Sequence, residues 1–319
     1  MQPSGFNLNW LQMGGMIAGG GLVLAVIHLS RWLKSRRREA RRERPPQREK
    51  LLRPAGYSAM CRLDDLADKL MLAVVQAAAT GLFFGAIAGS LVPLAQGLAL
   101  NRFTFAQIRG VPGAELLPAV MLLMLVALLW CARETILVLK LDAEMETWRL
   151  GMRGEQTVGE ALADRSLAAA GYVAFHDVPG DGKWNIDHVV VGPAGVFVLE
   201  TKARPRRKAK RQQQENIARF DGRTLEFPWC EDRDAVQQVQ RNAGWVREFL
   251  AAFPPKDVPV QPVIVVPGWY VEAKGNYPVK VMNATYLVNY LRGAKPRFTL
   301  DALAPVIQRL DERCRMLEF

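Results

Sequence analysis

Cysteine and histidine are scarce in this chain, and their spacing excludes the common sites built from them. The four cysteines, Cys61, Cys131, Cys230 and Cys314, lie far apart, with no Cys-x-x-Cys pair. A disulfide framework or a zinc site would need closer and more regular spacing, so the pattern fits a reducing compartment. The three histidines are also scattered, and no His-rich metal site is expected.

Positive charge is sparse over most of the chain, although the formal net charge is +11. The surplus comes from two short segments. Residues 31–53 hold eleven Lys or Arg against three Glu, and RPRRKAKR at 204–211 adds six positive charges and no negative one. The rest of the chain is slightly acidic. The composition therefore does not describe a generally basic protein, and the role of each basic segment has to be judged separately.

Charged residues are missing altogether from long stretches of the N-terminal half. Three such stretches predict transmembrane helices at about 11–29, 71–95 and 115–133, because each is about long enough to cross a bilayer. No Lys or Arg precedes the first stretch, so it lacks the charged start of a signal peptide. The alternative is that one of the three is a re-entrant segment or a buried helix of a soluble unit.

The distribution of Lys and Arg between the predicted spans indicates their orientation. Residues 31–53 are far richer in these residues than the second connection, which holds only two arginines. The positive-inside rule then predicts a bacterial inner-membrane protein with its N-terminus outside and its C-terminal domain in the cytoplasm. Binding of residues 31–53 to anionic lipid or nucleic acid is the alternative role. Residues 134–150 predict a helical stalk that completes a membrane region over residues 1–150.

Residues 151–319 predict a separate α/β domain. A helix over 154–170 is followed by the apolar strands YVAFHDV, HVVVG and VFVLETK, a helix over 234–252, the strand VPVQPVIVV, and C-terminal helices. Strands interspersed with helices in this order favour a sheet covered by helices.

The segment NIDHVVVGPAGVFVLETK predicts a hairpin with charges at one end. With Pro193 and Ala194 as the central turn residues, Asp187 lies opposite Glu200, and Lys202 shares their face. The apolar residues on both faces indicate a covered sheet. Two close carboxylates repel each other, and a divalent cation between them is the usual remedy. The alternative is a solvated sheet end, where such charges are ordinary.

The same string, with Gly154-Glu155 before it and a Gln-bearing helix after it, resembles the nuclease-related domain (NERD) family. That family belongs to the PD-(D/E)xK nuclease-like superfamily, and the resemblance covers about residues 153–291. It implies a restriction-endonuclease-like central mixed sheet flanked by helices, here preceded by the all-α transmembrane region. It also implies metal-dependent hydrolysis of phosphodiester bonds, with Mg²⁺ or Mn²⁺ as the cofactor.

The resemblance assigns roles to individual residues. Asp187 and Glu200, with Glu155, match the acidic residues expected to hold the metal, and Lys202 matches the lysine expected to act on the attacking water and the phosphate. The family's glutamine falls best on Gln238, although Asp234-Ala235 stands where the family often has Asn-Pro. Gln237 and Gln240 therefore remain alternatives. All five assigned residues count as candidate catalytic residues: Glu155, Asp187, Glu200, Lys202 and Gln238.

Several partners are expected on this interpretation. The basic block beside the site is a candidate nucleic-acid contact, with a cytoplasmic loop near anionic lipid as the alternative; its charged residues are Arg204, Arg206, Arg207, Lys208, Lys210 and Arg211. DNA is preferred over RNA as the expected substrate. The lipid bilayer and membrane or mobile-element proteins are further candidate partners. A catalytically silent nucleic-acid-binding module and a protein-binding scaffold are the competing functions.

Overall fold

The computed structural model describes residues 51–100, 117–182, 184–206 and 216–316. The described residues divide into two compact units. The first unit contains residues 65–100 and 117–145. The second contains residues 51–64 together with the described part of residues 146–319. Residues 51–64, which include the first turns of the long helix that begins at Tyr57, fold with the C-terminal unit.

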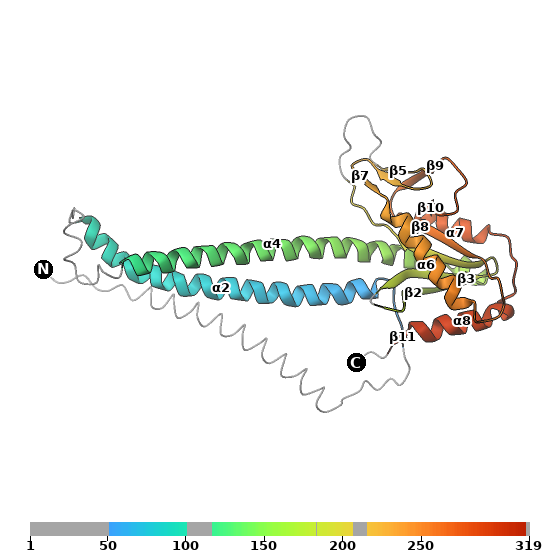
Figure 1. Cartoon of the computed structure of the whole chain (residues 1–319), viewed down its shortest axis with the longest axis horizontal. Helices are drawn as coiled ribbons and strands as arrows, with labels where there is room; N and C mark the ends of the chain where they lie inside the picture. The colour runs from blue at the N-terminus through green and yellow to red at the C-terminus, as the bar shows by residue number, and fades with distance from the viewer. Residues whose placement is uncertain (1–50, 101–116, 183, 207–215, 317–319) are drawn as a thin grey trace, which may run out of the picture. The chain divides into compact units, whose positions relative to one another are not determined.

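Two long helices form the described part of the first unit. They belong to α2 (Tyr57–Leu100) and α4 (Leu117–Leu162), which run alongside each other (Figure 1). Both are rich in leucine and alanine, which favour helix strongly. Among the side chains that the structure describes, several large apolar ones on α4 are exposed, including Met121, Leu128 and Leu139.

The structure does not support the predicted transmembrane region. The first predicted span, 11–29, lies outside the described residues, whereas the spans at 71–95 and 115–133 fall largely in α2 and α4. Among the described residues, no helix combines the length and the apolar character needed to cross a membrane. The cellular location and orientation inferred from these spans stay predictions.

A five-stranded mixed sheet is the centre of the second unit. Its strand order is β10-β8-β4-β3-β2. Strands β10, β8 and β4 run parallel to one another, and β3 runs antiparallel to both of its neighbours, β4 and β2. The strands are β2 (Val173–Pro179), β3 (Asn185–Gly192), β4 (Gly195–Thr201), β8 (Val260–Val265) and β10 (Lys280–Met282).

Two smaller sheets complete the strands of this unit. A four-stranded mixed sheet has the order β7-β6-β5-β9, and a two-stranded sheet joins β1 to β11, so the two ends of the described chain pair with each other. The strands are β1 (Leu51–Leu52), β5 (Ile217–Phe220), β6 (Leu225–Phe227), β7 (Cys230–Asp232), β9 (Tyr270–Ala273) and β11 (Arg315–Met316).

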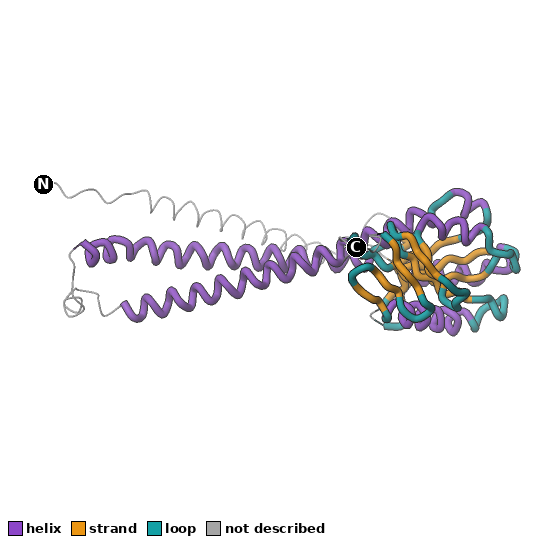
Figure 2. Tube along the Cα trace, turned by 90° about the horizontal axis from the view of Figure 1, so that it is seen from above, coloured by secondary structure: helices purple, strands orange, loops and turns teal. Residues whose placement is uncertain are grey.

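Helices cover both faces of the five-stranded sheet (Figure 2). On one face Val189 and Val198 pack with buried residues of α6 (Asp234–Leu250) and α8 (Leu300–Cys314). On the other face Val190 and Leu199 pack with the end of α4 and with α7 (Ala284–Arg292), beside the short α5 (Arg165–Ala169). The predicted covered sheet is therefore confirmed, as a mixed α/β arrangement flanked by helices.

The hairpin β3–β4 has the predicted register. Gly192 pairs with Gly195, and the ladder continues to His188 opposite Leu199. The turn requires glycine at position 195. Gly195 has φ 129°, and a Cβ there would lie 2.7 Å from the backbone oxygen of Pro259. The ladder ends one pair before the predicted pairing of Asp187 with Glu200, because the Asp187 carboxylate accepts the backbone N–H of Thr201 instead.

The predicted stalk and the first helix of the α/β domain are one continuous helix. α4 passes through Gly151 and Gly154 and ends at Leu162, and α5 begins separately because the Asp164 side chain caps the N–H of Ser166. Gly154 has a packing role: a Cβ there would lie only 2.6 Å from the Cβ of Ala203. The missing side chain thus lets α4 approach the end of β4.

This packing predicts opposite effects for two glycines of the same helix. Gly154→Ala should lower the free energy of unfolding by about 1–2 kcal/mol, because overpacking outweighs the gain in helix propensity. Gly151→Ala is the matched control, because nothing lies within 4 Å of the added Cβ. It should raise the stability by up to about 1 kcal/mol. Urea unfolding of the full chain measures both, and equal effects of the two substitutions would contradict the close approach.

Candidate functional site

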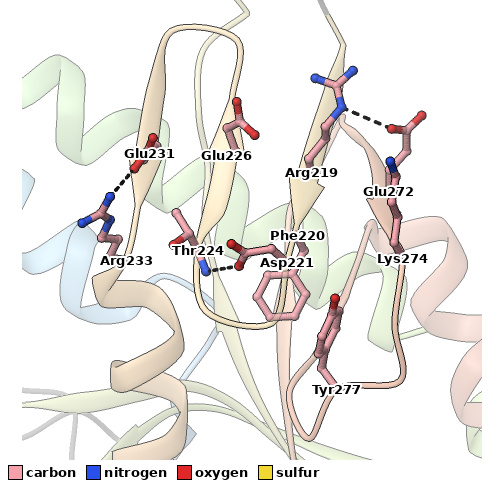
Figure 3. A pocket seen from close by; sticks show the side chains of 10 residues that line it. All are labelled: Arg219, Phe220, Asp221, Thr224, Glu226, Glu231, Arg233, Glu272, Lys274 and Tyr277. Carbon is pink, nitrogen blue, oxygen red and sulfur yellow. Dashed lines mark hydrogen bonds and ion pairs between the residues drawn. The ribbon is translucent and has the colours of Figure 1, made fainter.

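A pocket on the four-stranded sheet is distinct from the predicted site. Charged residues of both signs line it, together with Phe220 and Tyr277 (Figure 3). Its Arg219 pairs with Glu272 at 3.3 Å, and its Arg233 pairs with Glu231 at 2.9 Å. These charges largely neutralise one another, and the candidate site residues from the sequence are not among those that line the pocket.

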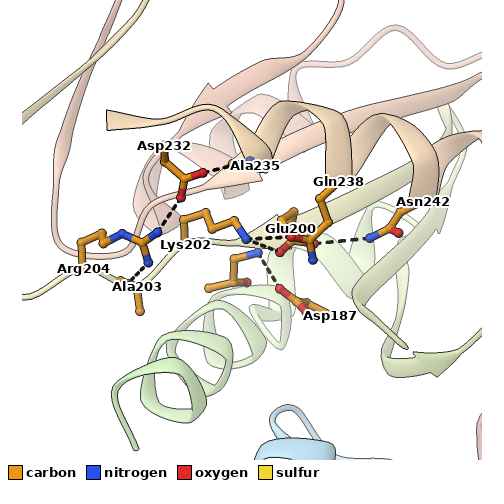
Figure 4. Close-up of polar contacts among 10 residues, drawn as sticks. Asp187, Glu200, Lys202, Ala203, Arg204, Asp232, Ala235, Gln238 and Asn242 are labelled. Atoms are coloured by element: carbon orange, nitrogen blue, oxygen red, sulfur yellow. Dashed lines mark hydrogen bonds and ion pairs between the residues drawn. The ribbon is translucent and has the colours of Figure 1, made fainter. Parts of the chain in front are cut away.

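The predicted residues Glu200 and Lys202 meet at the C-terminal end of β4. The Lys202 Nζ donates to Glu200 Oε1 over 2.8 Å, and the Glu200 side chain is only 3% exposed (Figure 4). The second oxygen of Glu200 accepts from the Asn242 amide of α6 at 3.3 Å. Both carboxylate oxygens of this buried acid therefore have partners, as burial of a charge requires.

Gln238 is the glutamine that reaches the site. Its Oε1 accepts from Lys202 Nζ at 2.9 Å, whereas Gln237 and Gln240 are exposed. The phase of α6 explains the difference, because Ala235, Val239 and other buried residues fix which side of the helix faces the sheet. Asn242 follows Gln238 by one helical turn, and that spacing was the signal by which the sequence could have revealed it.

Asp187 lies beside this group at the start of the hairpin. Its Oδ2 accepts the N–H of Thr201 at 2.6 Å. Burial raises the pKa of the Asp187 carboxyl well above its usual range, and the negative charges of Glu200 and Glu155 raise it further. Burial likewise raises the pKa of Glu200, against the opposing effect of Lys202. The two carboxylates thus share one nearby ammonium group.

Glu155 approaches from α4 and is electrostatically linked to the same group. Burial raises its pKa to about 7, and the carboxylates of Asp177 and Glu200 contribute in the same direction. A hydrogen bond with the Gly56 backbone and the charge of Lys202 oppose this shift. A carboxyl with a pKa near 7 can exchange a proton at neutral pH, which is unusual for glutamate.

Asp177 is a further acid that the sequence analysis missed. It follows His176 in β2, at the position across from Asp187, and it is completely buried with φ 48°. Its carboxylate pairs with Arg53 at 2.9 Å and also accepts hydrogen bonds from the Ser58 N–H and the Asn185 amide. Two of these donors come from residues more than a hundred positions earlier, so no local pattern could have indicated them.

The acids at this site suit a hard cation, although not as a ready-made cage. Oxygen ligands, mutual repulsion and raised pKa values are what a divalent ion would relieve. However, a search of the described part of the chain finds no group of three or more His, Cys, Asp or Glu arranged to hold a metal. The donor chemistry therefore fits a divalent ion that Asp187 and Glu200 would hold together with water and substrate, because Mg²⁺ commonly keeps such ligands.

The structure describes only the first two residues of the predicted nucleic-acid contact. The Arg204 guanidinium pairs with the buried Asp232 and lies over the Phe227 ring, so it has a structural role. The exposed Arg206 donates to the carbonyl of Gly268. The other four predicted contacts, Arg207, Lys208, Lys210 and Arg211, lie outside the described residues.

His188 points away from the acids, as the alternation along β3 predicts. It is fully buried, and its Nδ1 lies 2.8 Å from the Nδ1 of His176 on β2. Burial lowers the pKa of both imidazoles. The pair lies beneath α4, because a Cβ on Gly159 of that helix would come within 3.8 Å of the His176 ring.

The stretch of chain that carries this site is similar to a known protein family. Residues 150–267 match the family model of the nuclease-related domain (NERD). The match begins in α4 and ends just after β8, and it confirms the resemblance over a shorter stretch than the 153–291 expected. It contains the five candidate catalytic residues. This part of the chain is similar to that family, and the match indicates a nuclease-like function and nucleic-acid binding. No curated protein and no solved structure matches the chain.

The raised pKa of Glu155 predicts a pH dependence of folding. A carboxyl with a folded pKa of about 7 and an ordinary pKa of 4.5 favours the folded state at low pH. That contribution is lost as pH rises from about 4.5 to 7. Glu155→Gln should therefore unfold less readily than the parent at pH 8, by up to about 3 kcal/mol, and differ little near pH 4.

Urea unfolding of the full chain in chelator, repeated from pH 4 to 8, measures this effect. Glu160→Gln is the matched control, because it removes one exposed carboxylate from the same helix. A constant difference between Glu155→Gln and the parent at every pH would show that ionisation of Glu155 does not destabilise the folded state.

Proposed function

We propose that the second unit hydrolyses phosphodiester bonds of nucleic acid with Mg²⁺ or Mn²⁺ as cofactor. The observation that carries this proposal is the convergence of Asp187, Glu200 and Glu155 around Lys202 at the end of a covered sheet. The match to a nuclease-related domain supports it. DNA is the first substrate to test.

Each side chain has a distinct part in this chemistry. Asp187 and Glu200 would hold the divalent ion. When bound, that ion would polarise a phosphate oxygen and lower the pKa of the attacking water. Lys202, held in place by Glu200 and Gln238, offsets negative charge that develops on the phosphate. Glu155, with a pKa of about 7, is suited to accept a proton from water near neutral pH.

A catalytically silent nucleic-acid-binding module is the second candidate. The observation that favours it is that no three His, Cys, Asp or Glu side chains among the described residues are grouped to hold a metal. On this alternative Lys202 and the acids form a structural network, and its removal would alter stability and binding without altering any turnover.

Cleavage by the full chain separates the two candidates. Linear, circular and single-stranded DNA and RNA are incubated with Mg²⁺, Mn²⁺ or chelator. We expect metal-dependent cleavage that falls about 100-fold or more in Glu200→Gln and Lys202→Ala, because each loses charge stabilisation in the transition state. Lys295→Ala, at an exposed lysine on another surface, should cleave normally.

Two results would contradict catalysis at this site. One is binding of the substrates without cleavage under any metal condition, which supports the silent module. The other is cleavage that persists unchanged in both Glu200→Gln and Lys202→Ala while chelator still abolishes it, which would place the reaction elsewhere.

A further inference from the structure

A row of side chains continues from the acid group along α6. Gln238 and Trp245 are seven residues apart, which is close to two helical turns, and Phe249 follows one turn later. The three therefore lie along the same edge of the helix. Gln238 contacts Lys202, so the aromatic part of this row begins about 10 Å from the site.

Trp184 lies beside this row and comes from the end of β3 that carries Asp187. It precedes β3 and stands three residues before Asp187, again about 10 Å along an extended chain. Its ring meets the edge of the Trp245 ring, with the centroids 5.4 Å apart and an interplanar angle of 84°. Even so, Trp184 is 40% exposed, one of the largest exposed apolar side chains of the second unit.

Gly180, directly after β2, packs closely against the Trp184 ring. A Cβ on Gly180 would lie only 2.3 Å from that ring, so the indole occupies the space that a side chain at Gly180 would need. Trp245 is fixed in turn, because its Nε1 donates to Asp181 Oδ2 at 2.7 Å. The Trp184 ring is therefore held on its inner side while part of its surface faces solvent.

A positive charge completes this cluster. Arg313 of α8 pairs with Asp181 at 2.7 Å, and its guanidinium lies 4.8 Å from the centre of the Trp245 ring. It also lies over Phe249, at 5.0 Å. The guanidinium of Arg313 thus covers the rings of Trp245 and Phe249. Among these three rings, Trp184 is the one with exposed surface on which a ligand could stack.

We propose that Trp184 stacks on an unpaired nucleobase of a nucleic-acid strand whose phosphate reaches Asp187, Glu200 and Lys202. The proposal rests on the proposed function and specifies its substrate as single-stranded or frayed nucleic acid. Stacking on an exposed aromatic ring tolerates any base sequence. A distance of about 10 Å corresponds to about three stacked nucleotides, because successive nucleotides of one strand rise about 3.4 Å.

Unpaired bases are the form of nucleic acid that suits this arrangement. Bases within a duplex are already stacked, and an enzyme must separate them before a side chain can cover a base face. Trp184 stands on a rim beside the site, where it can cover a base that has left the duplex.

Binding of defined strands by the full chain in chelator tests the proposal without any cleavage. The probes are a fluorescent single strand, the same strand with abasic positions, and the corresponding duplex. Trp184→Ala should weaken binding of the intact single strand about tenfold and leave binding of the abasic strand unchanged. Trp184→Phe should retain most of the affinity. Tyr286→Ala, at an exposed aromatic on α7, is the matched control.

Base-dependent binding that is equal in the parent and in Trp184→Ala would overturn the proposal, as would equal binding of intact and abasic strands by the parent. Failure to bind any nucleic acid would overturn it as well. General misfolding is recognised because it weakens binding of intact and abasic strands alike. The outcome is independent of catalysis: a chain that cleaves without using Trp184 retains the proposed function alone, and one that stacks bases without cleaving retains this inference alone.

Discussion

Burial of several carboxylates around a single ammonium group is the constraint on which the rest of the second unit depends. Asp187, Glu200 and Glu155 all have raised pKa values, and Lys202 lowers each of them in part. A fold would normally separate such charges or expose them, because unpaired buried charge is expensive. Here the strands β3 and β4 and the helices α4 and α6 bring these side chains together. The close approach of α4 to Ala203 at Gly154 is part of what allows this arrangement.

The segment before the long helices is also part of this unit. Leu51 and Leu52 pair with the C-terminal strand, Arg53 neutralises the buried Asp177, and the backbone of Gly56 hydrogen-bonds to Glu155. These residues lie far outside the stretch that matches the nuclease-related domain. The electrostatic balance at Glu155 is therefore set in part by the Gly56 backbone, which the family match does not contain.

Local patterns were sufficient for the hairpin and insufficient for its surroundings. The Gly-Pro-Ala-Gly turn determines the register, which the structure confirms from Gly192 to His188. The role of Asp177 depends on Arg53 and Ser58, which approach it only in the folded chain. The sequence does not indicate the continuity of α4, because Gly151 and Gly154 look like helix ends. In the structure, packing against Ala203 requires a small residue at Gly154.

The helix α6 connects the features that the sequence presents separately. Its buried side fixes its rotation against the sheet, and that rotation places Gln238 and Asn242 on Lys202 and Glu200. The same rotation directs Trp245 toward Asp181 and Trp184. Because all four contacts follow from one helix phase, a change that turned α6 would disturb the acid group and the aromatic row together. The choice of Gln238 over Gln237 and Gln240 is therefore a consequence of packing, and the same packing places an aromatic surface two turns from the acids.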